Sequence, residues 1–218
     1  MSADYIEVAY SRNTAIFARI SVVSSALGLG LLLLLHFIQP NLSPLSDFIS
    51  QYAVGKFGIL MNVAFLSFAI SLASFAMSYR SLSPSRLLRT GVVLACICAI
   101  GMLLGALFNT DSADIVRASP TITGMLHNIG GQLNLTPFVA LLVTFGVRHV
   151  DAVKPVWRRM LTISVVVLSF TLGFVITAAW SEGDFGPGSI TALFGRLMLV
   201  SYFIWQYVAL KCLLKNET

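Results

Sequence analysis

The side chains best suited to chemistry lie beside, or just inside, the ends of long apolar runs. Ser46 and Asp47 follow the first run, Asp111 follows the third, and His127 and Arg196 lie a short way inside later runs. A histidine near carboxylates can act as a general acid or base, and a guanidinium can bind a phosphate or a carboxylate. These five residues are therefore the first candidates for a functional site.

Arg196 raises the question of its partner, because an arginine inside a membrane is costly unless its charge is paired or reaches water. A carboxylate could pair with it and close the end of a helix bundle, or the guanidinium could clamp an anionic lipid group. The candidate partners are Asp47, Asp111, Glu182 and Asp184. The candidate ligand-binding residues are Arg196, His127, Asp47, Asp111, Tyr52 and Gln132. For Gln132 and Asn134, hydrogen bonding between helices is the competing explanation.

Catalysis and metal binding stay open as alternatives. A membrane-embedded lipid hydrolase or transferase would draw on His127, Asp111, Asp47 and Ser46, but no GxSxG motif supports a serine nucleophile. Whether the protein is an enzyme is left undecided. We expect no metal or cofactor, because no ligand spacing such as HxxxH or HExxH occurs. The alternatives are zinc held by His36, His127 and Asp111, and haem held by His36 and His127.

The elements that position these residues are predicted to be six transmembrane helices. The chain is 57% hydrophobic and 11% charged over 218 residues, and a soluble domain carries roughly twice that charge fraction. About 20 apolar residues cross a bilayer as a helix, whereas barrel strands are short and alternate apolar with polar residues. We predict one all-α polytopic domain over 1–218, with helices at about 14–38, 57–79, 87–108, 122–147, 156–180 and 190–214.

The basic residues predict the orientation of these helices. With the N-terminus in the cytoplasm, eleven Lys and Arg fall at inside ends and only Lys56 and Arg117 fall in outside loops. This bias predicts that both termini are cytoplasmic. Anionic lipid head groups account for the basic turns, so we expect membrane lipids as partners and no nucleic acid.

Three local patterns add detail. Leu45–Val54 has helical periodicity, with Ser43 as a possible N-cap and Gly55 at the end, so the first outer loop is predicted to hold a short amphipathic helix that covers the bundle. Pro137 is predicted to kink the fourth helix. The GxxxG motif at 101–105 predicts close approach of a neighbouring helix.

Four segments resemble a known family. They read LSPLSDFISQYAVG at 42–55, GALFNTD at 105–111, GMLH at 124–127 and GR at 195–196, and they are similar to the prokaryotic family called domain of unknown function 998. The resemblance implies a multi-pass protein of the cytoplasmic (inner) membrane of a prokaryote. It also implies that recurring family positions fall on Ser46, Asp47, Tyr52, Gly55, Asp111, His127 and Arg196.

The function expected from these patterns is binding. An outward-facing polar pocket would take a lipid or small amphiphilic molecule, in a transporter-like or accessory protein. The alternatives are the lipid hydrolase or transferase described above, possibly metal-dependent, and a structural or assembly factor whose polar layer only locks the bundle. A homo-oligomer is compatible with each of them.

Overall fold

The computed structural model describes residues 12–80, 82, 85–112, 119–181 and 188–214. These residues form helices and connecting turns, with no β-strand among them. The α-helices are α2 (Arg12–Ile38), α3 (Gly58–Tyr79), α4 (Arg86–Leu107), α6 (Ile122–Gln132), α7 (Thr136–Gly146), α8 (Lys154–Trp180) and α9 (Thr191–Leu214). Two short 3₁₀-helices, η2 (Ile49–Ala53) and η3 (Asp151–Val153), lie in connections.

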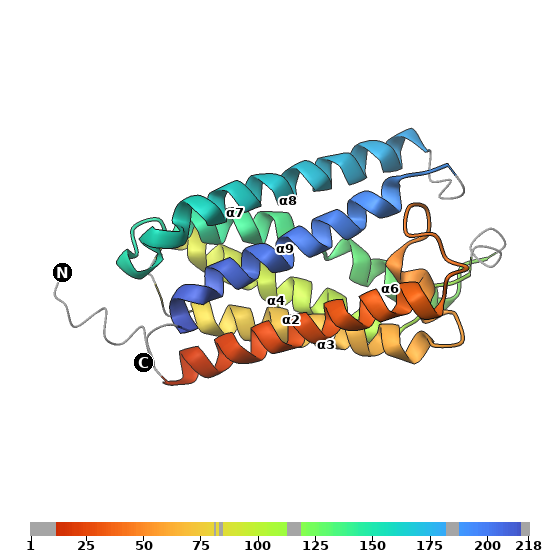
Figure 1. Ribbon diagram of the computed structural model, residues 1–218, viewed down its shortest axis with the longest axis horizontal. Helices are drawn as coiled ribbons and strands as arrows, with labels where there is room; N and C mark the ends of the chain where they lie inside the picture. Colours follow the sequence, from red (N-terminus) through yellow and green to blue (C-terminus); the bar gives the residue numbers. More distant parts are fainter. Residues whose placement is uncertain (1–11, 81, 83–84, 113–118, 182–187, 215–218) are drawn as a thin grey trace.

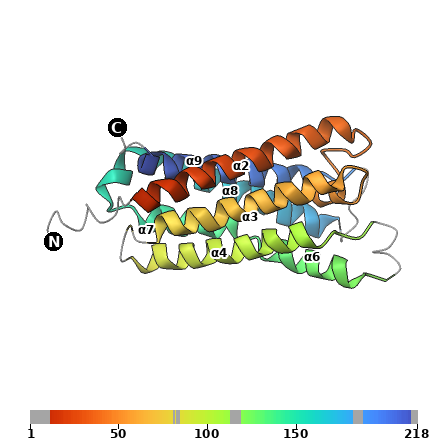
Figure 2. The same cartoon turned by 90° about the horizontal axis from the view of Figure 1, so that it is seen from below.

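Six helical segments in this part of the chain are long and apolar enough to cross a membrane, with α6 and α7 together making the fourth. The predicted six-helix membrane bundle is therefore confirmed. Each segment packs against the next along the chain, and α9 packs against α2, which closes the ring (Figure 2). In Figure 1, α2 begins and α9 ends at the same end of the bundle. We call the opposite end, where α2 ends and α3 begins, the distal end.

Aromatic side chains from α3 and α9 fill the centre of the ring. Phe68 stacks on Phe203 with ring centroids 4.7 Å apart, and Phe75 lies 5.4 Å from Trp205. Trp205 is fully buried and donates its indole N–H to the hydroxyl of Thr144 on α7, 3.0 Å away. A large buried ring whose polar atom is hydrogen-bonded holds the neighbouring helices in position.

A second buried contact ties three helices through polar groups. The amide nitrogen of Gln206 on α9 donates to the hydroxyls of Ser21 on α2, at 2.6 Å, and Ser71 on α3, at 2.7 Å. Each serine hydroxyl also bonds the other serine's main-chain oxygen at 2.8 Å. Such bonds between membrane helices contribute roughly 1 kcal/mol each.

The helices α4 and α6 approach closely at two glycines. A Cβ atom added to Gly101 would meet the main-chain oxygen of Gly130 at 2.5 Å, and one added to Gly130 would meet that of Gly101 at 2.6 Å. Only glycine permits backbones to come this near. The close approach predicted from the GxxxG motif is therefore present, with α6 as the neighbour.

The fourth span is broken rather than kinked. α6 ends at Gln132 and α7 begins at Thr136, with Pro137 in the first turn of α7. Proline suits that position because its missing N–H would have no helical partner there. The backbone N–H of Leu135 in the break donates to the Cys98 sulfur, 3.2 Å away. The interruption predicted at Pro137 thus lies just before it, and neighbouring groups take up the freed backbone hydrogen bonds.

The connection between α2 and α3 differs from the amphipathic helix predicted there. Its helical part is only η2, five residues of 3₁₀-helix, with Phe48 and not Ser43 at its N-cap. The Asp47 carboxylate instead accepts a hydrogen bond of 2.7 Å from the backbone N–H of Ser43. This side-chain bond favours a turn over a helix at the segment's start. The segment nevertheless lies over the distal end of the bundle (Figure 1).

Candidate functional site

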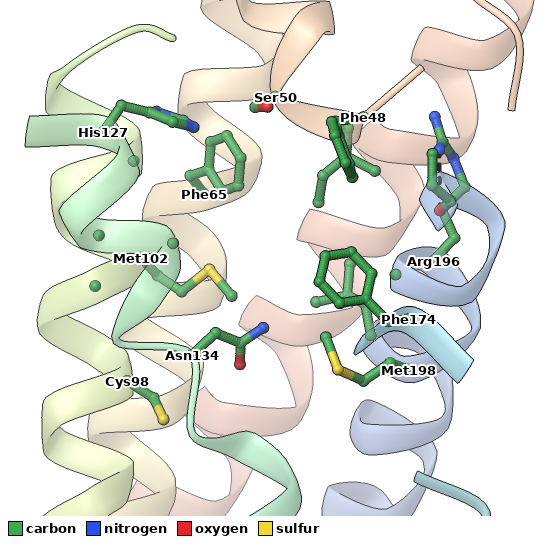
Figure 3. A pocket seen from close by; sticks show the side chains of 18 residues that line it. Phe48, Ser50, Phe65, Cys98, Met102, His127, Asn134, Phe174, Arg196 and Met198 are labelled. Atoms are coloured by element: carbon green, nitrogen blue, oxygen red, sulfur yellow. Dashed lines mark hydrogen bonds between the residues drawn. The ribbon is translucent and has the colours of Figure 1, made fainter. Parts of the chain in front are cut away.

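A cavity of about 180 Å³ lies in the distal half of the bundle. Its walls come from α4 and α6 on one side, α8 and α9 on the other, α3, and the α2–α3 connection (Figure 3). The larger apolar side chains that line it are Phe48, Ile49, Phe65, Met102, Phe174, Met198 and Leu199. Two of these are methionines, whose flexible side chains adapt to the shape of a ligand.

The cavity separates two pairs of helices. α6 packs on α4, and α8 packs on α9, but in the described part of the chain α6 has no comparable packing against α8 or α9. Gly131 of α6 lines the cavity and is also exposed at the surface of the bundle. A Cβ atom added there would meet nothing within 4 Å. The cavity therefore reaches the side of the bundle near Gly131.

His127 is buried in the cavity wall and points inward from α6 (Figure 3). Its Nδ1 lies 2.8 Å from the main-chain oxygen of Phe108. Because a carbonyl oxygen only accepts, Nδ1 carries the proton, and Nε2 of the neutral ring keeps its lone pair. The Phe65 ring holds the imidazole edge-on, at 5.8 Å between ring centroids. Nε2 has no hydrogen-bond partner among the described residues, so an acceptor faces the cavity.

Asn134 lies deeper, in the break between α6 and α7, and its amide nitrogen points toward the middle of the cavity (Figure 3). Its side-chain oxygen accepts from the hydroxyl of Thr136 at 2.7 Å and from the Thr136 backbone N–H at 3.5 Å. The oxygen is therefore occupied by the first residue of α7. The amide nitrogen has no such partner in the described chain, so Asn134 offers a donor.

Arg196 also lines the cavity, and its hydrogen bonds go to the loop, to α2 and to the Ala192 main-chain oxygen of its own helix, which lies 3.3 Å from Nη1. Nη1 donates to the main-chain oxygen of Asp47 at 2.6 Å, and Nε donates to Nε2 of His36 at 3.2 Å. His36 can accept because its Nδ1 faces the Leu32 carbonyl oxygen, 2.6 Å away. The second terminal nitrogen, Nη2, is covered and lacks a partner among the residues described. Arg196 thus fastens the α2–α3 connection to the bundle by its backbone.

Tyr52 belongs to the same contact and not to the cavity wall. It is fully buried, its ring lies 5.9 Å below the Arg196 guanidinium carbon, and its ring centroid is 5.1 Å from that of His36. Burial raises the pKa of the Tyr52 phenol, while the charge of Arg196 lowers it in part. Cation–π contacts of this kind stabilise a desolvated arginine.

Asp111 is placed at the start of α6 instead of in the cavity. Its two carboxylate oxygens accept from the backbone N–H of Thr121 at 2.9 Å and from the Thr121 hydroxyl at 2.5 Å. The Thr121 hydroxyl in turn accepts from the backbone N–H of Gly124 at 3.0 Å. A carboxylate at a helix N-terminus interacts favourably with the helix dipole. Asp111 therefore caps the helix that carries His127.

Of the other predicted site residues that the structure describes, none lines the cavity. Ser46 is buried in the α2–α3 connection, and Gln132 is exposed on the outside of α6. Glu182, Asp184 and Arg117 lie outside the described residues. No group of three or more His, Cys, Asp or Glu side chains that could hold a metal occurs in the part of the chain searched. His36, His127 and Asp111 are thus not gathered into one ligand set.

The cavity also includes residues that the sequence patterns did not single out, above all the glycines of α6. Their spacing in the sequence could have identified them. His127, Gly130, Gly131 and Asn134 are spaced as i, i+3, i+4 and i+7, which places them on one helical face. Asn128 and Gln132 form the neighbouring stripe, and both are exposed. Small residues beside His127, rather than polarity alone, distinguish the inward stripe.

One of the comparisons with known proteins found a match. A family model described as "Protein of unknown function (DUF998)" matches residues 22–210. No curated protein and no solved structure matches the chain significantly. The family match spans most of the sequence, from within α2 to within α9. The chain therefore belongs to the DUF998 family of proteins of unknown function.

Proposed function

We propose that this membrane protein binds a lipid or small amphiphilic molecule in the distal cavity, as a transporter-like or accessory component. The observation that carries the proposal is the composition of the cavity wall. Its larger side chains are mostly apolar, and His127 and Asn134 add one acceptor and one donor that have no partner in the described part of the chain. Apolar walls with a few placed polar groups are typical of small-molecule sites.

The size and position of the cavity support the same function. A cavity of 150 Å³ in another protein is large enough for benzene, so about 180 Å³ suffices for a head group or for part of a chain. The cavity adjoins a broken helix, and ligand sites in membrane transporters recur at such breaks. An opening between α6 and α8 would let an amphiphile enter from the bilayer.

Binding is favoured over acid–base catalysis by the positions of the acids. The Asp111 carboxylate is occupied by Thr121, and the Asp47 carboxylate by Ser43. Among the described residues, His127 therefore has no carboxylate partner to orient it as a catalytic base. In this proposal the distal end faces the extracytoplasmic side, because the basic residues gather at the opposite end.

Native mass spectrometry of the purified protein tests the proposal. Leucine at Gly195 would project into the cavity, and its Cβ would meet the Phe174 ring at an ordinary 3.5 Å. The matched control is Gly30→Leu, where an added Cβ meets nothing within 4 Å and the residue is exposed on α2. We expect a retained lipid in the wild type and in Gly30→Leu, and its loss in Gly195→Leu. Equal lipid retention in all three proteins would refute binding in this cavity.

A further inference from the structure

Two polar atoms of the cavity wall that lack a partner in the described part of the chain, Nε2 of His127 and the amide nitrogen of Asn134, have opposite hydrogen-bonding character, and this restricts the ligand. Nε2 of His127 can only accept from a ligand while the ring is neutral, because Nδ1 donates to Phe108. The amide nitrogen of Asn134 can only donate, because the Asn134 oxygen is occupied by Thr136. A ligand that satisfies both must bring an O–H or N–H group and a carbonyl or similar oxygen.

Charge in and around the cavity restricts it further. No Asp, Glu or Lys of the described chain lines the cavity, so a cationic head group finds no counter-charge there. Arg196 is the lining residue with a formal charge, but its Nε and Nη1 are engaged and its Nη2 is covered. An anionic group would also face the lone pair of His127. The open hydrogen-bonding atoms of His127 and Asn134 therefore match an uncharged polar group best.

Resting on the proposed function, we infer that the ligand is an uncharged amphiphile with a hydroxyl and a carbonyl group, of the monoacylglycerol type. The hydroxyl donates to Nε2 of His127 near the distal end. The ester carbonyl accepts from the amide of Asn134, seven residues further along the chain and deeper in the cavity (Figure 3). The acyl chain lies against Phe174 and Met198 and leaves the cavity between α6 and α8.

Two conservative variants remove the proposed ligand contacts and keep the hydrogen bonds that stabilise the fold. His127→Asn places an amide N–H where Nδ1 donates to Phe108, but it removes Nε2. Asn134→Asp keeps the oxygen that Thr136 bonds, at a helix start where a negative charge is favourable, but it removes the donor. Both variants therefore retain the hydrogen bond that each residue makes to the protein.

The test uses the full-length protein and three probes, measured by native mass spectrometry titration. Monoolein carries hydroxyls and an ester carbonyl, methyl oleate carries only the ester, and oleate carries a charge. We expect the wild type to prefer monoolein over methyl oleate by roughly tenfold, the contribution of one buried hydrogen bond. His127→Asn should abolish this preference without changing methyl oleate binding. Asn134→Asp should weaken both esters, again by about tenfold.

Two outcomes would overturn the inference and leave the proposed function intact. One is that the wild type binds the two esters equally, with Gly195→Leu abolishing both. The other is that oleate binds more tightly than monoolein, which would assign the site to an anion. If none of the probes binds the wild type and no lipid is retained on purification, the proposed function fails together with the inference.

Discussion

Arg196 donates a hydrogen bond of 2.6 Å from Nη1 to the main-chain oxygen of Asp47, and not to the Asp47 carboxylate. The carboxylate bonds the backbone of Ser43 instead. A buried arginine that holds a main-chain oxygen fixes the path of the loop whatever side chain that loop residue carries. The distal connection is thus attached to α9 through its backbone, and this attachment forms one edge of the cavity.

This arrangement predicts unequal effects of removing the two charges. In Asp47→Asn, the amide oxygen can still accept from Ser43, so the free energy of unfolding should fall by less than about 1 kcal/mol. In Arg196→Gln, the bonds to Asp47 and His36 are lost, and the fall should be about 2 kcal/mol or more, because hydrogen bonds from a charged donor are the stronger kind. Denaturant titration of each variant in detergent measures both free energies of unfolding. Equal losses would mean that a carboxylate–arginine pair holds the loop.

The Asp111 carboxylate and Gly124 are predicted to be energetically coupled. A Cβ atom added at Gly124 would overlap the carboxylate, so Gly124→Ala should cost about 1–3 kcal/mol. With Asp111→Ala already present, the same change should cost nothing, or stabilise α6 by up to about 1 kcal/mol through better helix propensity. A double-mutant cycle measures this coupling. Additive effects would show that Asp111 does not lie over the start of α6.

Alanine substitutions at two adjacent glycines of α6 are predicted to change the stability of the bundle differently. Gly130→Ala should destabilise the bundle by about 1–3 kcal/mol, because its Cβ would meet the Gly101 oxygen at 2.6 Å. Gly131→Ala, with open space around the added Cβ, should be neutral or slightly stabilising. Thermal unfolding midpoints of the two variants provide the comparison. The packing of α4 on α6 would be wrong if Gly131→Ala were the more damaging change.

The polar contact around Gln206 is predicted to stabilise the bundle without contributing to ligand binding. Gln206→Leu removes the bonds to Ser21 and Ser71, which keep their mutual bonds to main-chain oxygens. The expected loss of stability is about 2 kcal/mol, from two bonds of roughly 1 kcal/mol each. Lipid retention, measured on the folded protein by native mass spectrometry, should match the wild type. A selective loss of lipid would connect this contact to the site.

The spans were predictable because length and hydropathy decide whether a helix can cross a membrane, whatever its neighbours are. Pro137 likewise predicted an interruption of the fourth span. The connection at 39–57 was not predictable in this way. Its apolar periodicity favoured an amphipathic helix, but the bonds of Asp47 to Ser43 and Arg196 shape its first half as turns. Tertiary contacts of this kind outweigh the helix propensity of a short segment.

The site was predictable only in part. His127 and Arg196 were candidates because polar groups within apolar runs need a partner, and both line the cavity. Asp47 and Asp111 were candidates for the same reason, but each satisfies its carboxylate locally, within ten residues along the chain. Asn134 looked like a helix-packing residue. Its role in the wall depends on the break at 133–135, where its amide nitrogen has no partner among the described residues.

An experimental density map of the protein in a lipid nanodisc tests the central claim most directly. We expect non-protein density in the cavity, with a polar end between His127 and Asn134 and a tail that leaves between α6 and α8. Well-resolved side chains closing that space, or water alone between His127 and Asn134, would contradict it.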